Sequence, residues 1–420
     1  MVRKKFLKNW WRLQVADNLF AENKKIIDLS LNRIEQVLAY FGNPQNSFKS
    51  IHIAGTNGKG STANIINSVL LNVPECKKVG LYTSPHLFSY FERIKINNEN
   101  IEENVFLSLK KDVENASDKL KIELTEFEIL TAICFLHFAR EQVDVAIIEV
   151  GLGGRFDATN VIEKPLCSAI ASISLDHTEK LGDTIDKVAY EKAGIIKENV
   201  PVVIARSNKG YKVISKVALE VGARVFDARE DIEIKKENNK NIALIGGKHH
   251  EFGLEGSFQA QNLALALGAL EFVPYKISEN ALRDGIKNVK WRFRAQFIYE
   301  KNLLIDGCHN PDGARVLREY LDKNFVNFKI RFIWGSLKHK DYNSVLENLV
   351  RVEDEVYLYE FDYPNALKYK DLDEKYRARF EVVENPFDII NRPENGTLTV
   401  ICGSLYMLGN LFKECEIEGL

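Results

Sequence analysis

An apolar run that leads into a glycine-rich turn is the strongest constraint on how this chain folds. Residues 51–62 read IHIAGTNGKGST, and a helix-like segment follows over 63–71. In such a turn, backbone N–H groups close around phosphate oxygens, the helix N-terminus adds partial positive charge and the lysine reaches the outer phosphates. The predicted phosphate-binding residues are Gly55, Thr56, Asn57, Gly58, Lys59, Gly60 and Ser61.

The spacing of this turn departs from the general phosphate-loop pattern, G-x-x-x-x-G-K-[ST], at two positions. Ile53 stands where that pattern has its first glycine, and Gly60 separates Lys59 from Ser61. A plain glycine-rich turn between a strand and a helix is therefore the competing interpretation. The order of strand, glycine, lysine, serine and helix favours phosphate binding.

Bulk composition excludes several classes of protein. A length of 420 residues suggests two or three domains. The net charge of -2 provides no overall basic field to attract nucleic acid or anionic lipid. No apolar run approaches the roughly 20 residues of a membrane-spanning helix. The six cysteines form no CxxC pair, which predicts a cytoplasmic protein without a structural zinc site.

Apolar strand-like runs alternate with amphipathic segments in the first half of the chain. This alternation is typical of a parallel sheet covered by helices on both faces. The runs are 50–54, 79–83, 143–150, 167–174 and 202–205. Thr125 and Glu128 form a capping-box pattern, which predicts a helix extending to about residue 140.

The second half of the chain contains a different series of signals. A stretch over 227–255, rich in Lys, Glu, Asn and Gly, predicts a small antiparallel appendage. Further strand signals follow at 297–305, 329–334, 355–359 and 398–402. We therefore expect an α/β protein with a large P-loop-containing parallel-sheet domain over 1–290 and a smaller α/β domain over 291–420.

Further motifs lie along the chain. They are TSPHL (83–87), ERI (92–94), EVGLGGRFDATN (149–160), SLDHT (174–178), LG (181–182), EKAGI (191–195), DGCHNP (306–311) and CGSLY (402–406). With GTNGKGS, and in this order, they resemble the folylpolyglutamate synthase/dihydrofolate synthase branch of the Mur ligase superfamily. The resemblance extends from residue 28 to residue 406 and implies a Mur-ligase-like fold.

The resemblance also implies an activity, which is ATP-dependent amide formation. Such an enzyme joins L-glutamate to 7,8-dihydropteroate, to tetrahydrofolate glutamates, or to both, through an acyl phosphate. The implied cofactors are ATP and Mg²⁺, with two metal sites. The implied partners are small molecules only, with no nucleic acid and no membrane, and the expected protein is a cytoplasmic monomer.

Oxygen ligands for magnesium are expected where parallel strands end. Ser84 follows the run 79–83, and Glu149 lies near the end of the run 143–150. By resemblance, Ser84 and Glu149 hold magnesium, His177 completes a second site, and Lys192 is carbamylated to become an anionic oxygen donor. The catalytic residues implied by the resemblance are Lys59, His177, Lys192 and His309.

Two of these residues have structural alternatives when they are considered without the family. His177 is then interpreted as a capping or buried histidine. Lys192 is then interpreted as part of the charged first turn of a helix. The pair His249-His250 lies in the polar appendage and matches no motif, so we interpret it as solvated.

The acceptor pocket is inferred by resemblance. DLSLNR (28–33) is similar to the family's Asp-Leu-Gly-Leu-Glu-Arg segment, with Ser30 replacing Gly and Asn32 replacing Glu. TEFE (125–128) resembles a pterin-binding block in which Phe127 is the stacking residue. The implied substrate-binding residues are Asp28, Leu29, Ser30, Thr125, Phe127, Glu128, Arg155, Phe156 and Asp157.

Contacts to adenine and ribose are expected by resemblance from Asn262, Arg294 and Asp306. The family's Trp-Pro-Gly-Arg turn is WRFR (291–294) in this chain, so Arg292 competes with Arg294 for the role. His309 is expected to assist phosphate or glutamate binding.

Two other functions are compatible with a phosphate-binding turn. A UDP-muramyl amino-acid ligase usually carries a UDP-binding domain ahead of the phosphate loop, and the 54 residues before Gly55 are too few for one. A non-catalytic nucleotide-binding relative or switch is disfavoured because no Asn-Lys-x-Asp motif is present. The retained residues Lys59, Glu149, His177 and Lys192 also disfavour it.

Overall fold

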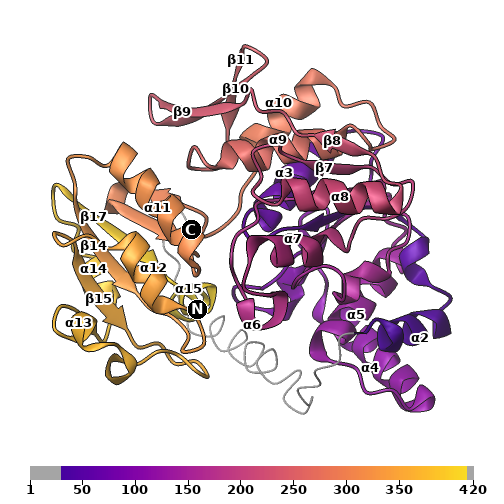
Figure 1. Ribbon diagram of the computed structural model, residues 1–420, viewed down its shortest axis with the longest axis horizontal. Coiled ribbons are helices and arrows are strands. Elements are labelled where there is room, and N and C mark those ends of the chain that lie inside the picture. The colour runs from indigo at the N-terminus through magenta and orange to yellow at the C-terminus, as the bar shows by residue number, and fades with distance from the viewer. Residues whose placement is uncertain (1–29, 414–420) are drawn as a thin grey trace, which may run out of the picture. The chain divides into compact units, whose positions relative to one another are not determined.

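The computed structural model describes residues 30–413 and divides into two compact units (Figure 1). The first unit contains the described residues up to 232, together with 244–251 and 260–289. The second contains 233–243, 252–259 and the chain from 290 onward. The second unit therefore includes two short segments from the stretch that the sequence assigned to the first domain.

The sheet of the first unit has eight strands in the order β4-β3-β2-β5-β1-β6-β7-β8. The strands are β1 (Lys49–Ala54), β2 (Val79–Tyr82), β3 (Ile94–Ile96), β4 (Glu99–Asn100), β5 (Val145–Glu149), β6 (Cys167–Ile170), β7 (Val202–Ile204) and β8 (Val225–Asp227). The pairings from β2 across to β8 are all parallel, whereas β3 pairs antiparallel with both β2 and β4. The carboxyl ends of β1, β2 and β5 thus meet at one edge.

Helices pack against this sheet through apolar side chains. Those of the first unit are α2 (Asn32–Tyr40), α3 (Lys59–Leu70), α4 (Glu103–Leu120), α5 (Glu126–Arg140), α6 (Thr178–Leu181), α7 (Ile185–Ala193), α8 (Tyr211–Val221), α9 (Gln259–Leu270) and α10 (Glu279–Asn288). The short helices η1 (Pro44–Asn46), η2 (Tyr90–Arg93) and η3 (Ala158–Val161) lie between them. One core cluster joins α2, α4 and α5 to β5, and another joins α7 and α8 to β7.

The predicted appendage is a three-stranded sheet of β9 (Glu233–Glu237), β10 (Lys240–Ile245) and β11 (Lys248–Phe252). Asn238 and Asn239, which connect the first two strands, have φ of 49° and 61°. Gly246 and Gly247, which connect the next two, have φ of 56° and 80°. Two consecutive left-handed residues are typical of the tight turns that join antiparallel strands, as predicted.

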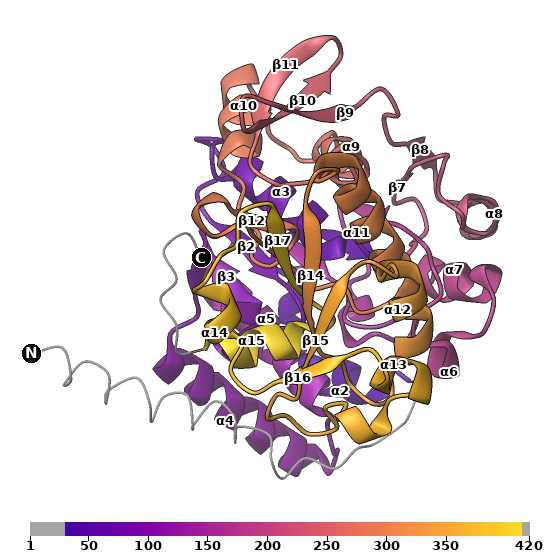
Figure 2. The same cartoon turned by 90° about the vertical axis from the view of Figure 1, so that its left-hand side faces the viewer.

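The second unit is built on a six-stranded sheet with the order β12-β13-β17-β14-β15-β16. The strands are β12 (Gln296–Ile298), β13 (Leu303–Asp306), β14 (Lys329–Trp334), β15 (Glu355–Tyr359), β16 (Glu381–Val383) and β17 (Thr397–Cys402). The helices are η4 (Tyr299–Lys301), α11 (Pro311–Asn324), α12 (Tyr342–Leu349), η5 (Tyr369–Asp371), α13 (Glu374–Arg377), α14 (Phe387–Ile390) and α15 (Leu405–Phe412). α11 and α12 lie side by side (Figures 1 and 2).

The α/β fold class predicted from the sequence is confirmed, with one local error. The run 297–305 was predicted as a single strand, but it is a hairpin in which β12 pairs antiparallel with β13. Asn302 adopts a left-handed φ of 43° and turns the chain there. Over residues 30–413, no helix has both the length and the apolar character that crossing a membrane requires.

Candidate active site

The glycine-rich turn lies between the end of β1 and the start of α3. Gly58 caps α3 with a φ of 89°, and Asn262 of α9 packs directly on it. A Cβ atom at Gly58 would overlap Asn262 Oδ1, so only glycine fits this contact. The turn therefore brings Asn262, predicted to contact the nucleotide, against the predicted phosphate-binding residues.

Two lysines converge on one carbonyl of this turn. Lys59 Nζ donates to Gly55 O at 3.0 Å and to Thr56 O at 3.2 Å. Lys192 Nζ, near the end of α7, donates to the same Gly55 O at 2.9 Å. Burial, and then the charge of Lys59, lowers the pKa of Lys192 to about 7.

Buried hydroxyls around the turn fit a phosphate ligand. Thr62 Oγ1 and Ser174 Oγ are buried, and neither has a hydrogen-bond partner among the described residues. Ser174 lies against the turn, because Thr56 Oγ1 donates to its carbonyl at 3.0 Å and accepts its N–H at 3.1 Å. Since buried polar atoms are normally paired, these two orphaned hydroxyls and the glycine cradle are consistent with a bound nucleotide phosphate.

Glu149 and Ser84 meet at the strand ends, as the sequence predicted. Glu149 pairs in register with Ile53 of β1, and its Oε2 accepts the Ser84 N–H at 3.1 Å. No cluster of three His, Cys, Asp or Glu side chains in the described part of the chain is arranged to hold a metal. A carboxylate and a hydroxyl completed by phosphate and water oxygens are nevertheless a donor set that magnesium accepts.

His177 caps the short helix α6 with a left-handed φ of 51°. Its N–H donates to Asp176 Oδ1 at 2.9 Å, and its ring nitrogens lie 3.8 Å from Asp176 and 3.7 Å from Glu179. Asp176 also raises the pKa of Lys192, against the effect of burial. Asp176 is thus a site residue to which the sequence assigned no role, although it lies within the SLDHT motif.

The capping box at the start of α5 is also a tertiary contact. Thr125 Oγ1 accepts the Glu128 N–H, and Glu128 Oε2 accepts the Thr125 N–H at 2.8 Å. Glu128 Oε1 accepts from Arg33 Nε of α2 at 3.2 Å. This carboxylate is therefore engaged in joining α2 to α5. Ser30 Oγ accepts the Asn32 N–H at 3.3 Å, whereas Asp28 and Leu29 lie outside the described residues.

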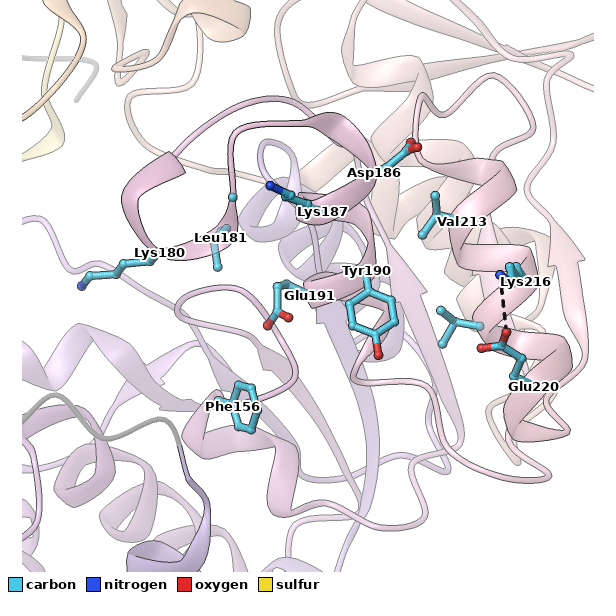
Figure 3. Close-up of a pocket in the computed structure, with 12 residues that line it drawn as sticks. Phe156, Lys180, Leu181, Asp186, Lys187, Tyr190, Glu191, Val213, Lys216 and Glu220 are labelled. Carbon is cyan, nitrogen blue, oxygen red and sulfur yellow. Dashed lines mark ion pairs between the residues drawn. The ribbon is translucent and has the colours of Figure 1, made fainter.

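Arg155, Phe156 and Asp157 are adjacent in sequence but have three different surroundings. The Arg155 guanidinium lies 4.2 Å from the Tyr190 ring centroid, and Asp157 is buried. Phe156 is 44% exposed and lines a cavity of about 530 Å³ bounded by α6, α7 and α8 (Figure 3). The structure thus does not bring these three predicted substrate contacts together on one surface.

In the second unit, the Asp306 carboxylate organises the loop that follows β13. It accepts the Ala295 N–H and the Cys308 N–H, both at 2.7 Å. Burial raises the pKa of Asp306, and the nearby Arg294 opposes that rise. His309 Nδ1 lies 3.1 Å from Gly307 O. Asp306 and His309, both predicted from one motif, are therefore neighbours.

Arg294, and not the competing Arg292, lies beside Asp306. Arg294 Nη1 would be 3.0 Å from a Cβ at Gly307, next to Asp306 in the chain, whereas Arg292 is exposed. Phe293, which replaces the family's glycine, has a left-handed φ of 59° and is buried. The turn thus keeps the backbone conformation that favours glycine while carrying a core aromatic residue.

We expect Gly58→Ala to raise the KM for ATP by about 10- to 100-fold, because the methyl group displaces Asn262 or the turn. Nucleotide titration measures this directly. Gly247→Ala is the matched control, since its φ of 80° carries the same backbone strain with nothing within 4 Å of the added Cβ. If the KM for ATP rose equally in both variants, backbone strain alone would explain the effect.

Comparison with known families agrees with this geometry. The Mur ligase middle domain model matches residues 53–270, and the model of the dihydrofolate synthetase C-terminal domain matches residues 291–414. The fold and the phosphate-loop site therefore define an ATP-dependent ligase of the Mur ligase type.

Individual relatives narrow this class. The dihydrofolate synthase/folylpolyglutamate synthase of Bacillus subtilis is 34% identical over 92% of this chain and 95% of its own length. The Escherichia coli protein of the same name is 30% identical over 97% of this chain and 95% of its own. A Mycobacterium tuberculosis folylpolyglutamate synthase complexed with ADP and AMPPCP has a TM-score of 0.84 and 30% identity, covering 95% of this chain and 97% of that one. The chain belongs to the dihydrofolate synthase/folylpolyglutamate synthase family.

Proposed function

We propose that this enzyme joins L-glutamate to 7,8-dihydropteroate, to tetrahydrofolate glutamates, or to both, using ATP to form an acyl phosphate. The observation that carries the proposal is the convergence of Lys59 and Lys192 on Gly55 O in a phosphate-binding turn. A solved E. coli FolC with 28% identity and a TM-score of 0.81 contains DHPP and ADP. The ADP in that structure supports the nucleotide site proposed here.

The chain's own groups provide positioning and charge for phosphoryl transfer. The N–H groups of the turn and the N-terminus of α3 bind the phosphates, and Lys59 turns from its two carbonyl partners toward the transferred group. We propose that Ser84 and Glu149 hold Mg²⁺, which supplies charge neutralisation when bound. We also propose a second metal site at His177. Relatives have been solved with AMPPNP and a manganese ion, which supports a divalent cation.

We propose that Lys192 becomes carbamylated. The neutral amine attacks the carbon of CO₂, one C=O bond opens to a carboxylate, and the displaced N–H proton goes to solvent. A lysine with its pKa lowered to about 7 is substantially neutral under physiological conditions, unlike an ordinary lysine. Burial next to Lys59 therefore keeps this amine neutral, so that it can react with CO₂. The ammonium group of Lys59 then lies near the resulting carbamate anion.

The remaining roles follow the matched motifs. We propose that Asn262, Arg294 and Asp306 bind the nucleoside and that His309 assists glutamate or phosphate binding. The folate acceptor is proposed to contact Ser30, Thr125, Phe127, Glu128, Arg155 and Phe156. Asp157 is proposed to act through the loop it holds, because its carboxylate is buried there.

The acceptor is the property to measure first. The matched relatives include a dihydrofolate synthetase of Saccharomyces cerevisiae at 32% identity and a folylpolyglutamate synthase of Lacticaseibacillus casei at 35% identity. These two identities are too close to decide which acceptor this chain uses. ADP release with ATP, Mg²⁺ and L-glutamate should require a folate acceptor. Turnover with dihydropteroate alone indicates a dihydrofolate synthase, and turnover with tetrahydrofolate as well indicates a bifunctional enzyme. If folded protein released no ADP with either acceptor, the result would contradict the proposed function.

Glu149→Gln should raise the Mg²⁺ concentration needed for half-maximal activity by about 10- to 100-fold, because a neutral amide is a weaker ligand. A Mg²⁺ titration at saturating ATP measures the change. Glu319→Gln, whose side chain is exposed on α11, is the control. An unchanged metal requirement in Glu149→Gln would exclude it as a ligand.

We also propose that the enzyme is a cytoplasmic monomer. The five described cysteines are all free thiols, as expected in a reducing compartment. Light scattering should give the mass of one chain, 48.0 kDa, and a mass of two chains would correct the proposal. The UDP-muramyl alternative is disfavoured because the relatives named above are folate ligases.

A further inference from the structure

A histidine lies in the interior of the first unit, two residues before β1 ends. His52 has no exposed surface and pairs in register with Ile148 of β5 and Ser168 of β6. Burial, with the charge of Lys197, lowers the pKa of His52 to about 3, so the imidazole is neutral at physiological pH. In the sequence this residue is only one member of an apolar run.

The His52 ring begins a chain of hydrogen bonds with a defined direction. Its Nε2 lies 2.8 Å from Thr159 Oγ1, which lies 2.5 Å from Asp157 Oδ1. Because Asp157 accepts hydrogen bonds on both oxygens, the threonine hydroxyl donates to it and must accept from His52 Nε2–H. His52 Nδ1 has no hydrogen-bond partner within the described chain, so the ring makes its one hydrogen bond through Nε2.

Asp157 in turn holds the loop 151–156. Its Oδ2 accepts the Leu152 N–H at 2.9 Å, and the Gly151 N–H provides a further bond to the carboxylate. Its Oδ1 accepts the Thr159 N–H at 3.1 Å as well as the Thr159 hydroxyl. The carboxylate is thus shared between the start of the loop and the segment that follows it.

The loop touches both halves of the proposed active site. A side chain at Gly151 would meet the Phe127 ring at 2.5 Å, and one at Gly154 would lie 2.9 Å from the Lys192 carbonyl oxygen. A shift of the loop therefore changes the acceptor pocket and its distance from Lys192.

We propose that His52 is a positioning residue for the folate acceptor. Its Nε2–H orients the Thr159 hydroxyl toward Asp157, and Asp157 then sets the position of the loop 151–156. This inference rests on the proposed function, because that function assigns Phe127 and the loop to the acceptor. The lysine contacts to Gly55 do not pass through this chain of bonds, so ATP binding is expected to stay unchanged.

Four single variants and one double variant test the relay. His52→Leu and Thr159→Val remove the hydrogen bond, and we expect each to raise the acceptor KM about 10- to 100-fold with an unchanged KM for ATP. His52→Gln and Thr159→Ser retain a donor or hydroxyl and should restore most of the loss. The double variant His52→Leu/Thr159→Val should raise the acceptor KM no further than either single variant. All three variants interrupt the same series of hydrogen bonds.

Ser68→Ala is the matched control for lost stability. It removes another hydrogen bond, from Ser68 Oγ to Gly285 O at 2.7 Å, between α3 and α10. We expect it to lower the unfolding temperature without changing the acceptor KM. A similar rise in acceptor KM in Ser68→Ala, or equal rises in both KM values in His52→Leu, would overturn the proposal.

Nitrogen-15 NMR of the imidazoles in the full, substrate-free chain tests the geometry without any folate chemistry. We expect His52, assigned by loss of its signal in His52→Gln, to be protonated on Nε2 and not to titrate between about pH 5 and about pH 8. A ring protonated on Nδ1, or one that titrates in this range, would overturn the relay. If wild-type enzyme instead showed no acceptor-dependent ADP release, the proposed function would fail while the tautomer was still measured.

Discussion

Replacing Lys59 by alanine is expected to reduce kcat by about 10³-fold or more, because phosphoryl transfer depends on fixed positive charge. Its ammonium group lies over the turn, 3.0 Å and 3.2 Å from the Gly55 and Thr56 carbonyl oxygens. The alanine variant leaves the backbone N–H groups in place, so it should still bind ADP while failing to release ADP from ATP. Coupled ADP assays and nucleotide titration separate the two effects.

Lys216→Ala is the control for this variant. Its side chain is 75% exposed on α8 and pairs only loosely with Glu220, 3.8 Å away. We expect wild-type turnover, because a surface ion pair contributes little. Full activity in Lys59→Ala would remove the phosphate-binding role from the turn.

Lys192→Ala is expected to lose turnover by about 10²- to 10³-fold, since the variant lacks the anionic oxygen donor proposed at this position. Added acetate or propionate should restore part of the activity by occupying the space of the lost carbamate. Lys192→Ala without rescue would leave a role for the amine, and wild-type activity would remove the residue from catalysis. Mass spectrometry of the intact wild-type protein under CO₂ provides a second readout of the adduct.

The pH dependence of carbamylation has a definite sign. CO₂ adds to the neutral amine, and the pKa of Lys192 is lowered to about 7. At limiting CO₂, activity should therefore rise with pH through about 7 and fall as the amine is protonated below it. Asp176→Asn removes a nearby anion that raises this pKa, so the profile should shift toward lower pH. An unshifted profile would contradict this electrostatic assignment.

Local signals predicted the parts of the site that depend on neighbours in the chain. The glycine-rich turn, the strand before it and the capping box at Thr125 were all recognisable, because each is formed by residues a few positions apart. The helix after the turn begins at Lys59, earlier than the predicted 63, because Lys59 and Gly60 also form its first turn. The hairpin at 296–306 was missed because an apolar run conceals its turn at Asn302.

The roles of individual side chains depend on contacts between segments that are distant in the sequence. The pairing of β1 with β5 and β6 places Glu149 beside the phosphate-binding turn. Thr159 reaches His52 only through folding, 107 residues away along the chain. Periodicity thus predicted the class of fold, because it reflects local conformation, whereas the motifs indicated the chemistry through their resemblance to a known family. Which buried group donates to which, and the separate surroundings of Arg155, Phe156 and Asp157, depended on packing between strands and loops that no local pattern encodes.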